Sequence, residues 1–311
     1  MPSTGRRTSC PAPGAEPVPR KARLDAELVR RELARSRAHA CELVAAGRVQ
    51  VRGILFPKPA SSIGTDTPIV VRDDPDDPGW ASRGAHKLVG ALDVFSPLGL
   101  EVADRRCLDA GASTGGFTDV LLRRGAREVV AADVGYGQLD WKLQTDERVR
   151  IHDRTNVRAL TPEQIGGPVD VVVGDLSFIS LTLVLPALLA CSEPTADLVP
   201  MIKPQFELGR NVGPGGVVRD PQRRVEAVLR VVRFAAECGL GLRAITASPL
   251  PGPSGNVEYF AWLRADAPTG EEHVEALVAD AVREGPQSSP TGGSKRGTDS
   301  SRRGTQRGGS A

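Results

Sequence analysis

The sequence predicts an α/β fold: a mostly parallel sheet that ends in an antiparallel hairpin, with a small α+β module in front of it. Apolar, strand-like runs alternate with helical segments over the middle of the chain, which is typical of parallel sheets. A glycine-rich turn follows the first run, and an acidic, Pro-rich stretch separates the runs from the N-terminal region. The runs lie at 105–110, 128–133, 149–152, 169–174 and 197–203.

The N-terminal region begins with a segment that has almost nothing apolar to bury. Residues 1–20 are rich in Pro, Arg and Gly, so we expect them to be disordered. Leu24, Leu28 and Leu33 then recur at near-helical spacing, which predicts a first short helix.

A second helix and a hairpin complete the predicted module, which spans 21–72. Ser36 can cap a helix that runs to Ala46. Polar and apolar residues alternate over 48–52, and a short apolar run follows at 54–56, which together predict two paired strands.

An acidic, Pro-rich segment follows the module, with turn-forming residues at nearly every position. We therefore place an interdomain linker at 73–81 and expect Trp80 to pack at the junction. The larger domain then spans 82–267 and opens with a helix over 86–95.

Two further helices in this domain have start signals. Thr161-Pro-Glu-Gln164 has the form of a capping box with proline at the first helical position, and Asp220-Pro221 starts a helix that Gly239 ends.

The C-terminal part begins with two strands, at about 241–248 and 256–264. Only a Pro/Gly loop separates them, so they are expected to pair antiparallel. Residues 268–311 are predicted to form a helix and then a basic, disordered tail. The tail either adds nonspecific affinity for phosphates or has no function.

Composition and charge narrow the function classes. The chain has 311 residues and a net charge of only +2, but 21–52 carries eight Lys/Arg against four acids. This local excess suggests a polyanion partner, and a solvated helix face is the alternative. The five cysteines lie far apart without metal-ligand spacing, so we expect neither a metal site nor a disulfide framework.

The sequence also bears on location. The first residues lack the apolar core of a signal peptide. The longest apolar run, 181–191, is interrupted by Pro186 and is far shorter than the roughly 20 residues that a bilayer span requires. We therefore expect a soluble, cytoplasmic protein with no membrane partner. The sequence does not decide the oligomeric state, and a monomer is the working expectation.

The segment Cys107–Thr118 reads as a nucleoside-binding turn. Asp109 stands two residues before Gly111, and Gly115-Gly116 would let the backbone approach a ligand. A second acid, Asp133, follows an apolar run about 20 residues later, where a ribose diol is usually held. A plain structural turn is the alternative for the glycines alone.

The leading carboxylate decides between two cofactors. The dinucleotide fingerprint places a helix N-terminus against a pyrophosphate, which a carboxylate would repel. A carboxylate suits the cationic end of S-adenosylmethionine, so we favour that cofactor over NAD. The residues expected to hold it are Asp109, Gly111, Ala112, Ser113, Gly115, Gly116, Phe117, Asp133 and Val134.

Four ionisable residues are the candidate catalytic groups: Lys87, Asp175, Lys203 and Glu258. Each lies beside a predicted strand end on the edge where open α/β sheets bind ligands. Asp175 follows an apolar strand, and Lys203 ends another and is held extended by Pro204. Surface salt bridges are the alternative for each residue taken singly.

These four residues suit methyl transfer to a hydroxyl, which is an in-line displacement. The enzyme must align the acceptor oxygen and make a weakly acidic hydroxyl more nucleophilic. A desolvated Lys203, tuned by Asp175 and Glu258, can bond the hydroxyl and stabilise or accept its proton, while Lys87 holds the network.

Over about 22–265 the chain resembles the TlyA, or haemolysin A, family, which joins an S4 RNA-binding domain to an FtsJ-like ribosomal RNA 2′-O-methyltransferase domain. The motifs that carry the resemblance are Arg23-Leu-Asp25, Ser36-Arg37, Ala46-Gly-Arg-Val49, Ser82-Arg-Gly-Ala-His-Lys-Leu88, Asp109-Ala-Gly-Ala-Ser-Thr-Gly-Gly-Phe-Thr118, Gly174-Asp-Leu-Ser-Phe178, Ile202-Lys-Pro-Gln-Phe-Glu207 and Asn256-Val-Glu258.

The resemblance implies that the four ionisable residues form the family's Lys-Asp-Lys-Glu catalytic tetrad. It also implies cytidine 2′-hydroxyls in 16S and 23S rRNA as acceptors, ribosomal subunits as partners, and sensitivity to capreomycin-type antibiotics. The RNA-binding residues that we expect are Arg23, Arg37, Arg48 and Arg83.

The linker departs from the family pattern, because the family carries Arg-Ala-Trp-Val where this chain has Pro78-Gly-Trp-Ala81. This puts in doubt any coupling between RNA docking and cofactor binding through the linker. Two competing hypotheses are a noncatalytic RNA-binding assembly factor and a membrane-damaging protein. The four filled tetrad positions argue against the first, and the lack of an export signal, a span or a long apolar amphipathic helix argues against the second.

Overall fold

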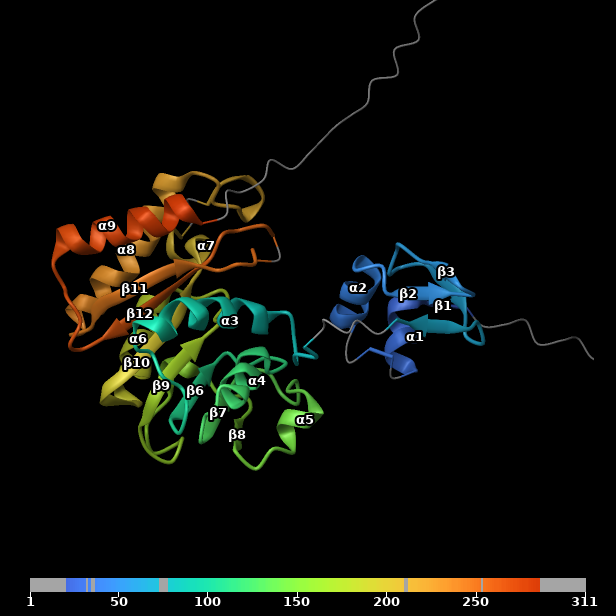
Figure 1. Cartoon of the computed structure of the whole chain (residues 1–311), viewed down its shortest axis with the longest axis horizontal. Coiled ribbons are helices and arrows are strands. Elements are labelled where there is room, and N and C mark those ends of the chain that lie inside the picture. Colours follow the sequence, from blue (N-terminus) through green and yellow to red (C-terminus); the bar gives the residue numbers. More distant parts are fainter. Residues whose placement is uncertain are drawn as a thin grey trace, which may run out of the picture.

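The computed structural model describes residues 21–31, 33–34, 37–72, 78–209, 212–252 and 254–285, which form two units (Figure 1). Several predictions lie outside these residues: the disordered segment 1–20, the cap at Ser36, most of the linker and the basic tail from residue 286.

The N-terminal unit is built on two helices and short strands. Its helices are α1 (Leu24–Arg30) and α2 (Arg37–Ala45). Leu24, Leu28, Val44 and Val49 are buried together in its core. Its strands are β1 (Lys21–Arg23), β2 (Val49–Val51), β3 (Ile54–Leu55), β4 (Ser62–Gly64) and β5 (Ile69–Val71).

The predicted hairpin of this unit is confirmed, since β2 and β3 pair antiparallel. Three further strands escaped the sequence reading: β5 pairs with β2, and β1 pairs with β4. Each has only three residues, which is too short for the alternation of apolar and polar side chains to stand out.

The larger unit is organised around one seven-stranded sheet in the order β11-β12-β10-β9-β6-β7-β8. The pairs among β10, β9, β6, β7 and β8 are parallel, and β12 runs antiparallel to both of its neighbours. The predicted fold class, with its antiparallel C-terminal hairpin, is therefore confirmed. The strands are β6 (Arg106–Ala110), β7 (Glu128–Ala132), β8 (Val149–His152), β9 (Val169–Gly174), β10 (Ser192–Ile202), β11 (Gly241–Ala247) and β12 (Tyr259–Arg264).

The chain order in this sheet reverses between β6 and β9. From β6 the chain moves outward through β7 to β8, and then crosses back to β9 on the other side. Such a switch point opens a crevice at the carboxyl ends of the two strands, where α/β folds bind their ligands.

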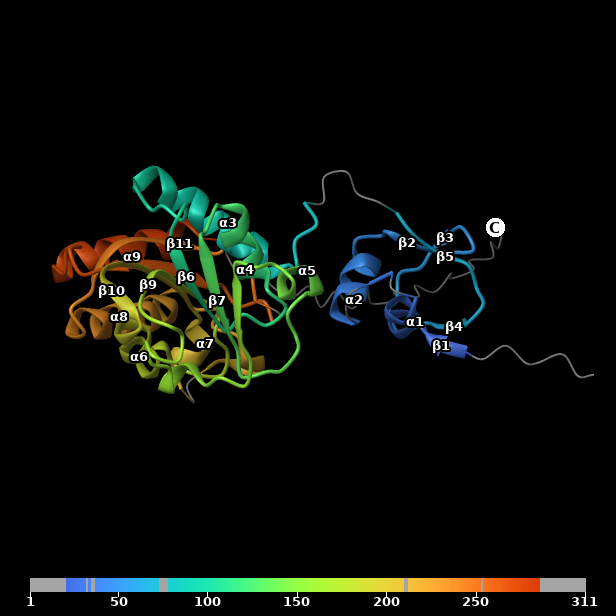
Figure 2. The ribbon, with the colours of Figure 1, turned by 90° about the horizontal axis from the view of Figure 1, so that it is seen from below.

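Helices cover both faces of the sheet. On one face lie α3 (Gly84–Phe95), α4 (Gly116–Arg123) and the short α5 (Trp141–Gln144). On the other lie α6 (Leu185–Ala190), α8 (Pro221–Glu237) and α9 (Glu271–Glu284). Figure 2 shows α3 on one side of the strands and α6 on the other.

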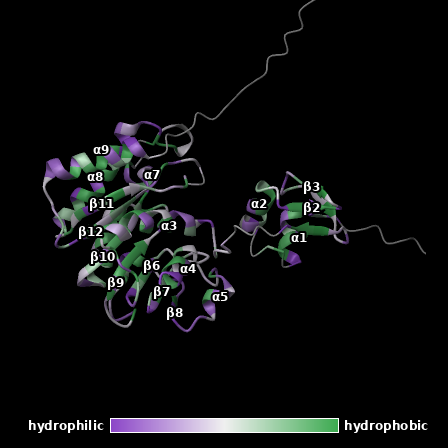
Figure 3. Cartoon of the chain, in the orientation of Figure 1, coloured by the Kyte–Doolittle hydropathy of each residue, from purple (hydrophilic) through white to green (hydrophobic). Residues whose placement is uncertain are grey.

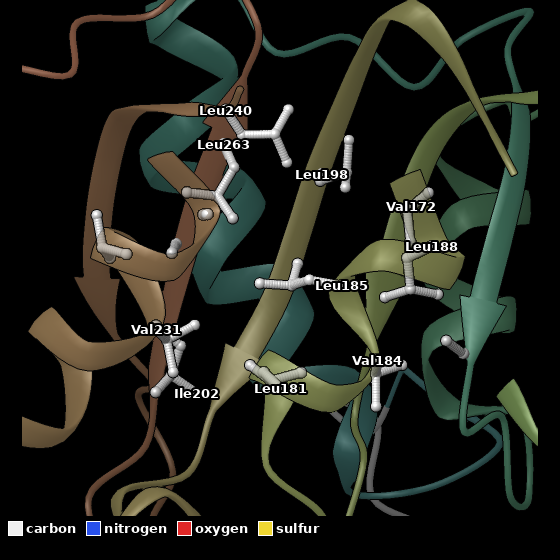
Figure 4. Packing of buried hydrophobic residues seen from close by; sticks show 14 of the residues in the cluster. Val172, Leu181, Val184, Leu185, Leu188, Leu198, Ile202, Val231, Leu240 and Leu263 are labelled. Atoms are coloured by element: carbon white, nitrogen blue, oxygen red, sulfur yellow. The ribbon is translucent and has the colours of Figure 1, made fainter. Parts of the chain in front are cut away.

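Apolar burial holds these layers together. Val172 of β9 and Leu198 of β10 are packed with Leu185 and Leu188 of α6 and with Val231 of α8 (Figure 4). Figure 3 shows the central strands as largely hydrophobic. Burial of each such side chain stabilises the fold by roughly 1.5–3 kcal/mol, so the packed helices fix the positions of the strand ends.

One predicted helix is wrong. Residues 162–166 form a turn rather than a helix, although the Gln164 side chain accepts the Thr161 N–H at 2.9 Å as a capping box requires. Gly166 and Gly167 follow at φ +79° and +116°, conformations that no α-helix contains. The capping hydrogen bond is present, but the two glycines prevent the chain from continuing as a helix.

Strand β10 is longer than predicted, because it begins at Ser192 rather than near residue 197. Its first pairing, Ser192 with Val169, is separated by a register irregularity from the regular ladder that starts at Asp197. The polar residues within this irregular stretch hide it from a search for apolar runs. The start of α8 is confirmed, since the Asp220 carboxylate accepts the Gln222 N–H at 2.9 Å.

Trp80 packs against the apolar cluster under α3 and α4, as predicted for the junction. The Arg123 guanidinium lies 4.1 Å from the centre of its ring and donates to the carbonyls of Pro78 and Gly79. The Asp119 carboxylate accepts the Ala81 N–H at 2.9 Å. Helix α4 thus holds the chain that leads into the larger unit.

Two features are absent from the described residues. No helix there has both the length and the apolar character needed to cross a bilayer. The same residues contain no group of three or more His, Cys, Asp and Glu side chains that could hold a metal ion.

Candidate active site

A cavity of about 490 Å³ opens at the switch point between β6 and β9. Its walls come from the turn after β6, the start of α3, the loops after β9, β10 and β11, and Glu42 of α2. The wall residues that bear on the argument are Arg83, Lys87, Gly111, Ala112, Ser113, Gly116, Phe117, Asp175, Ser177 and Lys203.

The glycines of the turn serve the protein's own packing, and the approach of a ligand to Gly115-Gly116 stays a prediction. A Cβ at Gly115, where φ is +93°, would meet Leu143, and one at Gly116 would meet the Ser82 side chain. At Gly111, where φ is +89°, a Cβ would lie 2.9 Å from the backbone oxygen of Asp175. The turn is therefore pressed against α3, α5 and the end of β9.

Asp109 lies beneath the turn and is fully buried, so its carboxylate does not form part of the cavity wall. One oxygen accepts the Thr118 hydroxyl at 2.7 Å, and the other has no hydrogen-bond partner. Burial raises the pKa of Asp109 to about 7, against the opposing effect of the Thr118 hydrogen bond. Direct contact between Asp109 and a cofactor stays a prediction.

Asp133 stands just past the end of β7 and braces the same turn. Its two oxygens accept the backbone N–H groups of Ser113 at 2.8 Å and Gly135 at 2.7 Å. Each carboxylate oxygen has a second lone pair, so both can still accept from a hydroxyl. The next residue, Val134, is 72% exposed. Asp133, Val134 and Gly115 are not among the residues of the cavity wall.

The four candidate catalytic residues come together as two ion pairs. Lys203 Nζ lies 2.5 Å from an Asp175 oxygen, and Lys87 Nζ lies 2.6 Å from Glu258 Oε2. Lys87, Asp175 and Lys203 line the cavity, whereas Glu258 is 1% exposed behind it. Glu258 is therefore the partner of Lys87, and not of Lys203 as the sequence reading had it.

Backbone geometry places Lys203 at the mouth of the cavity. The residue follows β10 in an extended conformation (φ −111°, ψ 101°), and Pro204 then opens the short helix α7 (Pro204–Glu207). This agrees with the constraint that proline puts on the residue before it. Lys203 Nζ also donates to the Ser177 hydroxyl at 2.8 Å.

Sequence reasoning missed three polar groups around the site. Ser177 contacts the Lys203 ammonium, Thr118 binds Asp109, and Glu207 is buried beneath the loop after β9. Ser177 and Glu207 stand in the motifs Gly174–Phe178 and Ile202–Glu207 that carried the resemblance. Their polar character next to two tetrad residues was the available signal.

The predicted RNA-binding arginines have different surroundings. Arg23 and Arg37 both pair with the buried carboxylate of Asp25, at 2.8 and 3.0 Å, so this cluster exposes less positive charge than its sequence suggests. Their guanidinium groups keep the pKa of Asp25 well below its usual range. Arg48 donates to the carbonyl of Arg72, and Arg83 lies exposed on the cavity wall.

Comparison with known proteins agrees with this geometry. The model of the FtsJ-like methyltransferases matches residues 80–265. The 16S/23S rRNA (cytidine-2′-O)-methyltransferase TlyA of Mycobacterium tuberculosis is 59% identical over 86% of this chain and 99% of its own length. Hemolysin A of Brachyspira hyodysenteriae is 38% identical over 73% of this chain and 92% of its own length.

A solved structure is similar to this one over most of its length. A protein of Streptococcus thermophilus described as a candidate hemolysin superposes with a TM-score of 0.66 at 37% identity, over 86% of this chain and 97% of that one. The sheet order and the cavity at its switch point define an α/β methyltransferase. The chain belongs to the FtsJ-like methyltransferase family and, within it, to the family of TlyA and haemolysin A.

Proposed function

We propose that this protein transfers a methyl group from S-adenosylmethionine to the 2′-hydroxyl of cytidines in ribosomal RNA, in the 16S molecule, the 23S molecule or both. The observation that carries the proposal is the Lys203 ammonium on the cavity wall, 2.5 Å from Asp175 and 2.8 Å from Ser177. The high identity to a relative with this activity over almost its whole length supports the same reaction.

The residues of the turn fit the proposed cofactor. Asp133 has lone pairs left for the two hydroxyls of a ribose, and the Asp109 carboxyl group, one oxygen of which lacks a hydrogen-bond partner, lies buried beneath the turn. S-adenosylmethionine, when bound, supplies the electrophilic methyl group on its sulfonium. Gly111, Ser113 and Phe117 on the cavity wall would contact it.

Lys203 is the residue that would act on the acceptor hydroxyl. Its ammonium is held between Asp175 and Ser177, and its side chain is only 9% exposed. A ribose hydroxyl that enters the cavity can take the place of one of these acceptors and bond to Nζ. The Lys203 ammonium then orients the oxygen, and the Asp175 carboxylate accepts the hydroxyl proton as the O–CH3 bond forms and the sulfonium C–S bond breaks.

Lys87 and Glu258 would support this centre rather than carry the proton. The pair joins the start of α3 to the start of β12, two elements that are 171 residues apart in sequence. Because Glu258 is almost fully buried, its charge depends on Lys87 for compensation. The pair therefore fixes one wall of the cavity.

The N-terminal unit would dock on RNA, as an S4 domain does, through its arginine-rich surface. We expect Arg48 of this unit, together with Arg23 and Arg37, which share the charge of Asp25, to meet phosphates, and we expect the same of the exposed Arg83 on the cavity wall of the larger unit. We place the protein in the cytoplasm with the ribosomal subunits, and we expect it to act as a monomer.

Methylation of isolated subunits tests the proposal. The purified protein is incubated with radiolabelled S-adenosylmethionine and with 30S or 50S subunits from cells that lack its gene, and 2′-O-methylation is mapped at nucleotide resolution. We expect label on cytidine riboses, and incorporation on the order of 10²-fold slower with Lys203→Ala. Subunit binding without label and without cofactor affinity by calorimetry would show an assembly factor. Leakage of liposomes without methylation would show a membrane-damaging protein.

A further inference from the structure

Glu207 is a buried carboxylate four residues after Lys203, at the end of α7. It is 2% exposed and does not line the cavity. Its Oε2 accepts the Ser180 hydroxyl at 2.5 Å, and its Oε1 accepts the Leu181 N–H at 2.9 Å. Both donors belong to the segment that follows β9.

That segment carries one of the four candidate catalytic residues, Asp175, and the Ser177 hydroxyl that the Lys203 ammonium contacts. It leaves β9 at Gly174, passes through Asp175 and Ser177, and ends where Ser180 starts a short 3-10 helix at Leu181. Ser177 and Asp175, which hold the Lys203 ammonium, therefore lie three and five residues before Ser180, whose hydroxyl donates to Glu207.

The loop does not hold this shape by backbone preference alone. Phe178 has a φ of +63°, and the left-handed conformation costs a non-glycine residue roughly 1–2 kcal/mol. Such a conformation persists only where the surroundings over-determine it. The Phe178 ring contacts the Phe206 ring of α7, with 5.1 Å between the ring centres.

Glu207 orders the end of the loop through a chain of hydrogen bonds. The single proton of the Ser180 hydroxyl points to Glu207, so the Thr182 hydroxyl, 2.8 Å away, donates to Ser180 Oγ. The Thr182 N–H donates to the same oxygen at 3.3 Å. Removal of the Glu207 carboxylate would leave the Leu181 N–H buried without an acceptor and free the Ser180 hydroxyl.

Three ties thus join α7 to the loop after β9: Lys203 with Asp175 and Ser177, Phe206 with Phe178, and Glu207 with Ser180 and Leu181. Only the first tie is given up when Lys203 turns to a substrate hydroxyl. The other two would keep Asp175 and Ser177 in place during that exchange.

We infer that Glu207 is a positioning residue for methyl transfer: by clamping Ser180 and Leu181, it sets where Asp175 and Ser177 meet the Lys203 ammonium. This inference rests on the proposed role of Lys203. A buried carboxylate with only a stabilising role is the alternative, and the experiment has to separate the two.

The test compares Glu207→Ala and Glu207→Gln by kcat at saturating RNA and cofactor, with cofactor affinity measured by calorimetry. Glu207→Ala should lower kcat by roughly 10- to 100-fold, the usual cost of a misplaced catalytic group, and leave cofactor affinity within about twofold. Glu207→Gln should recover most of the loss. Its amide oxygen still accepts the Leu181 N–H, and its NH2 group can donate to Ser180 Oγ.

Asp197→Asn is the matched control, because it alters a buried carboxylate at the opposite end of the regular part of β10. Asp197 accepts from Trp262 at 2.7 Å and from Arg264 at 2.9 Å, and no residue of the cavity wall contacts it. This variant should lower the melting temperature while kcat of the folded protein stays within about twofold. Equal effects of Glu207→Ala and Asp197→Asn on kcat and melting temperature would overturn the inference.

A double-mutant cycle separates failure of the inference from failure of the proposed function. If Glu207 acts through Lys203, then Glu207→Ala added to Lys203→Ala should lower kcat by less than about twofold further. Full additivity would assign Glu207 a role independent of Lys203. An active Lys203→Ala protein would refute the proposed mechanism itself, whereas an inactive Lys203→Ala beside an unaffected Glu207→Ala would refute the inference alone.

Discussion

The two lysine–carboxylate pairs of the site have the same chemistry and different surroundings. Lys87 and Glu258 are 2.6 Å apart, with side chains 10% and 1% exposed. Lys203 and Asp175 are 2.5 Å apart, but the Asp175 side chain is 25% exposed and Ser177 offers the ammonium a second acceptor. Both lysines line the cavity, but the carboxylate of the first pair is buried behind it, whereas the carboxylate of the second pair is partly exposed to it.

Because of this difference we propose different roles for the two pairs. Lys203 and Asp175 would act on the substrate, and Lys87 and Glu258 would support them. An ammonium with two acceptors at a cavity wall can exchange one of them for a substrate oxygen at little cost. An ammonium whose partner is fully buried cannot leave without stranding a charge. Position in the fold, and not residue type, therefore assigns the roles.

The largest effect should come from Lys203→Ala. It removes the group proposed to bond the acceptor hydroxyl, so kcat should fall on the order of 10²-fold or more. Lys87→Ala should reduce kcat less and the melting temperature more. Single-turnover methylation and thermal unfolding of both proteins check the contrast, which is broken if Lys87→Ala has the larger rate effect and the smaller stability effect.

Loss of a carboxylate should give the same order of stability effects, with the larger effect at the Lys87–Glu258 pair. Glu258→Ala leaves the buried Lys87 without its partner and should lower the free energy of unfolding by about 3–5 kcal/mol. Asp175→Ala should cost less, about 1–3 kcal/mol, because the Asp175 side chain is partly exposed and the buried Lys203 ammonium keeps the Ser177 hydroxyl as an acceptor. Urea unfolding followed by circular dichroism measures both, and similar values would mean that the two pairs are equally buried in solution.

Asp109 sharpens the comparison, because its hydrogen-bond partner is the Thr118 hydroxyl rather than a lysine. Burial raises its pKa from 3.8 to about 7, so the folded protein holds this proton more tightly than the unfolded chain. Its contribution to stability is therefore full below about pH 4 and is lost as the pH rises to 7.

Asp109→Asn should lack this pH dependence. Between pH 4 and 7, wild type should lose stability relative to the variant by up to about 1.4 kcal/mol per pH unit. Urea unfolding across this range gives both curves. Parallel curves would show that Asp109 is ionised in the folded protein throughout.

The smallest effects should lie in the N-terminal unit, where charges serve binding. Arg48→Glu should weaken subunit binding, reduce the salt dependence of the affinity, and leave cofactor affinity unchanged. Arg37→Glu should in addition lower the stability of the unit, since it places a second negative charge beside Asp25. Filter binding at several salt concentrations, with calorimetry for the cofactor, tests both variants. Loss of cofactor affinity in Arg48→Glu would point to misfolding.

The sequence reading succeeded where a signal is local. The five apolar runs of the parallel sheet, the Asp220 cap and the C-terminal hairpin each follow from neighbouring residues, and all are present. It failed at Thr161–Gln164, where the cap is formed but two glycines downstream turn the chain away. It also missed the short strands β1, β4 and β5, whose pairing depends on distant partners.

Neighbouring residues are enough to predict the fold class, the glycine turn after β6 and the four ionisable residues at strand ends, because strand alternation and residue chemistry are local properties of a sequence. The pairing of those residues is seen only in the folded protein, since Lys87 contacts Glu258 across 171 positions of the chain. The burial of Asp109 beneath the turn and the hydrogen bonds of Glu207 to the loop that carries Asp175 are likewise properties of the folded protein. Such contacts depend on the order of strands in the sheet, which no local pattern of residues encodes.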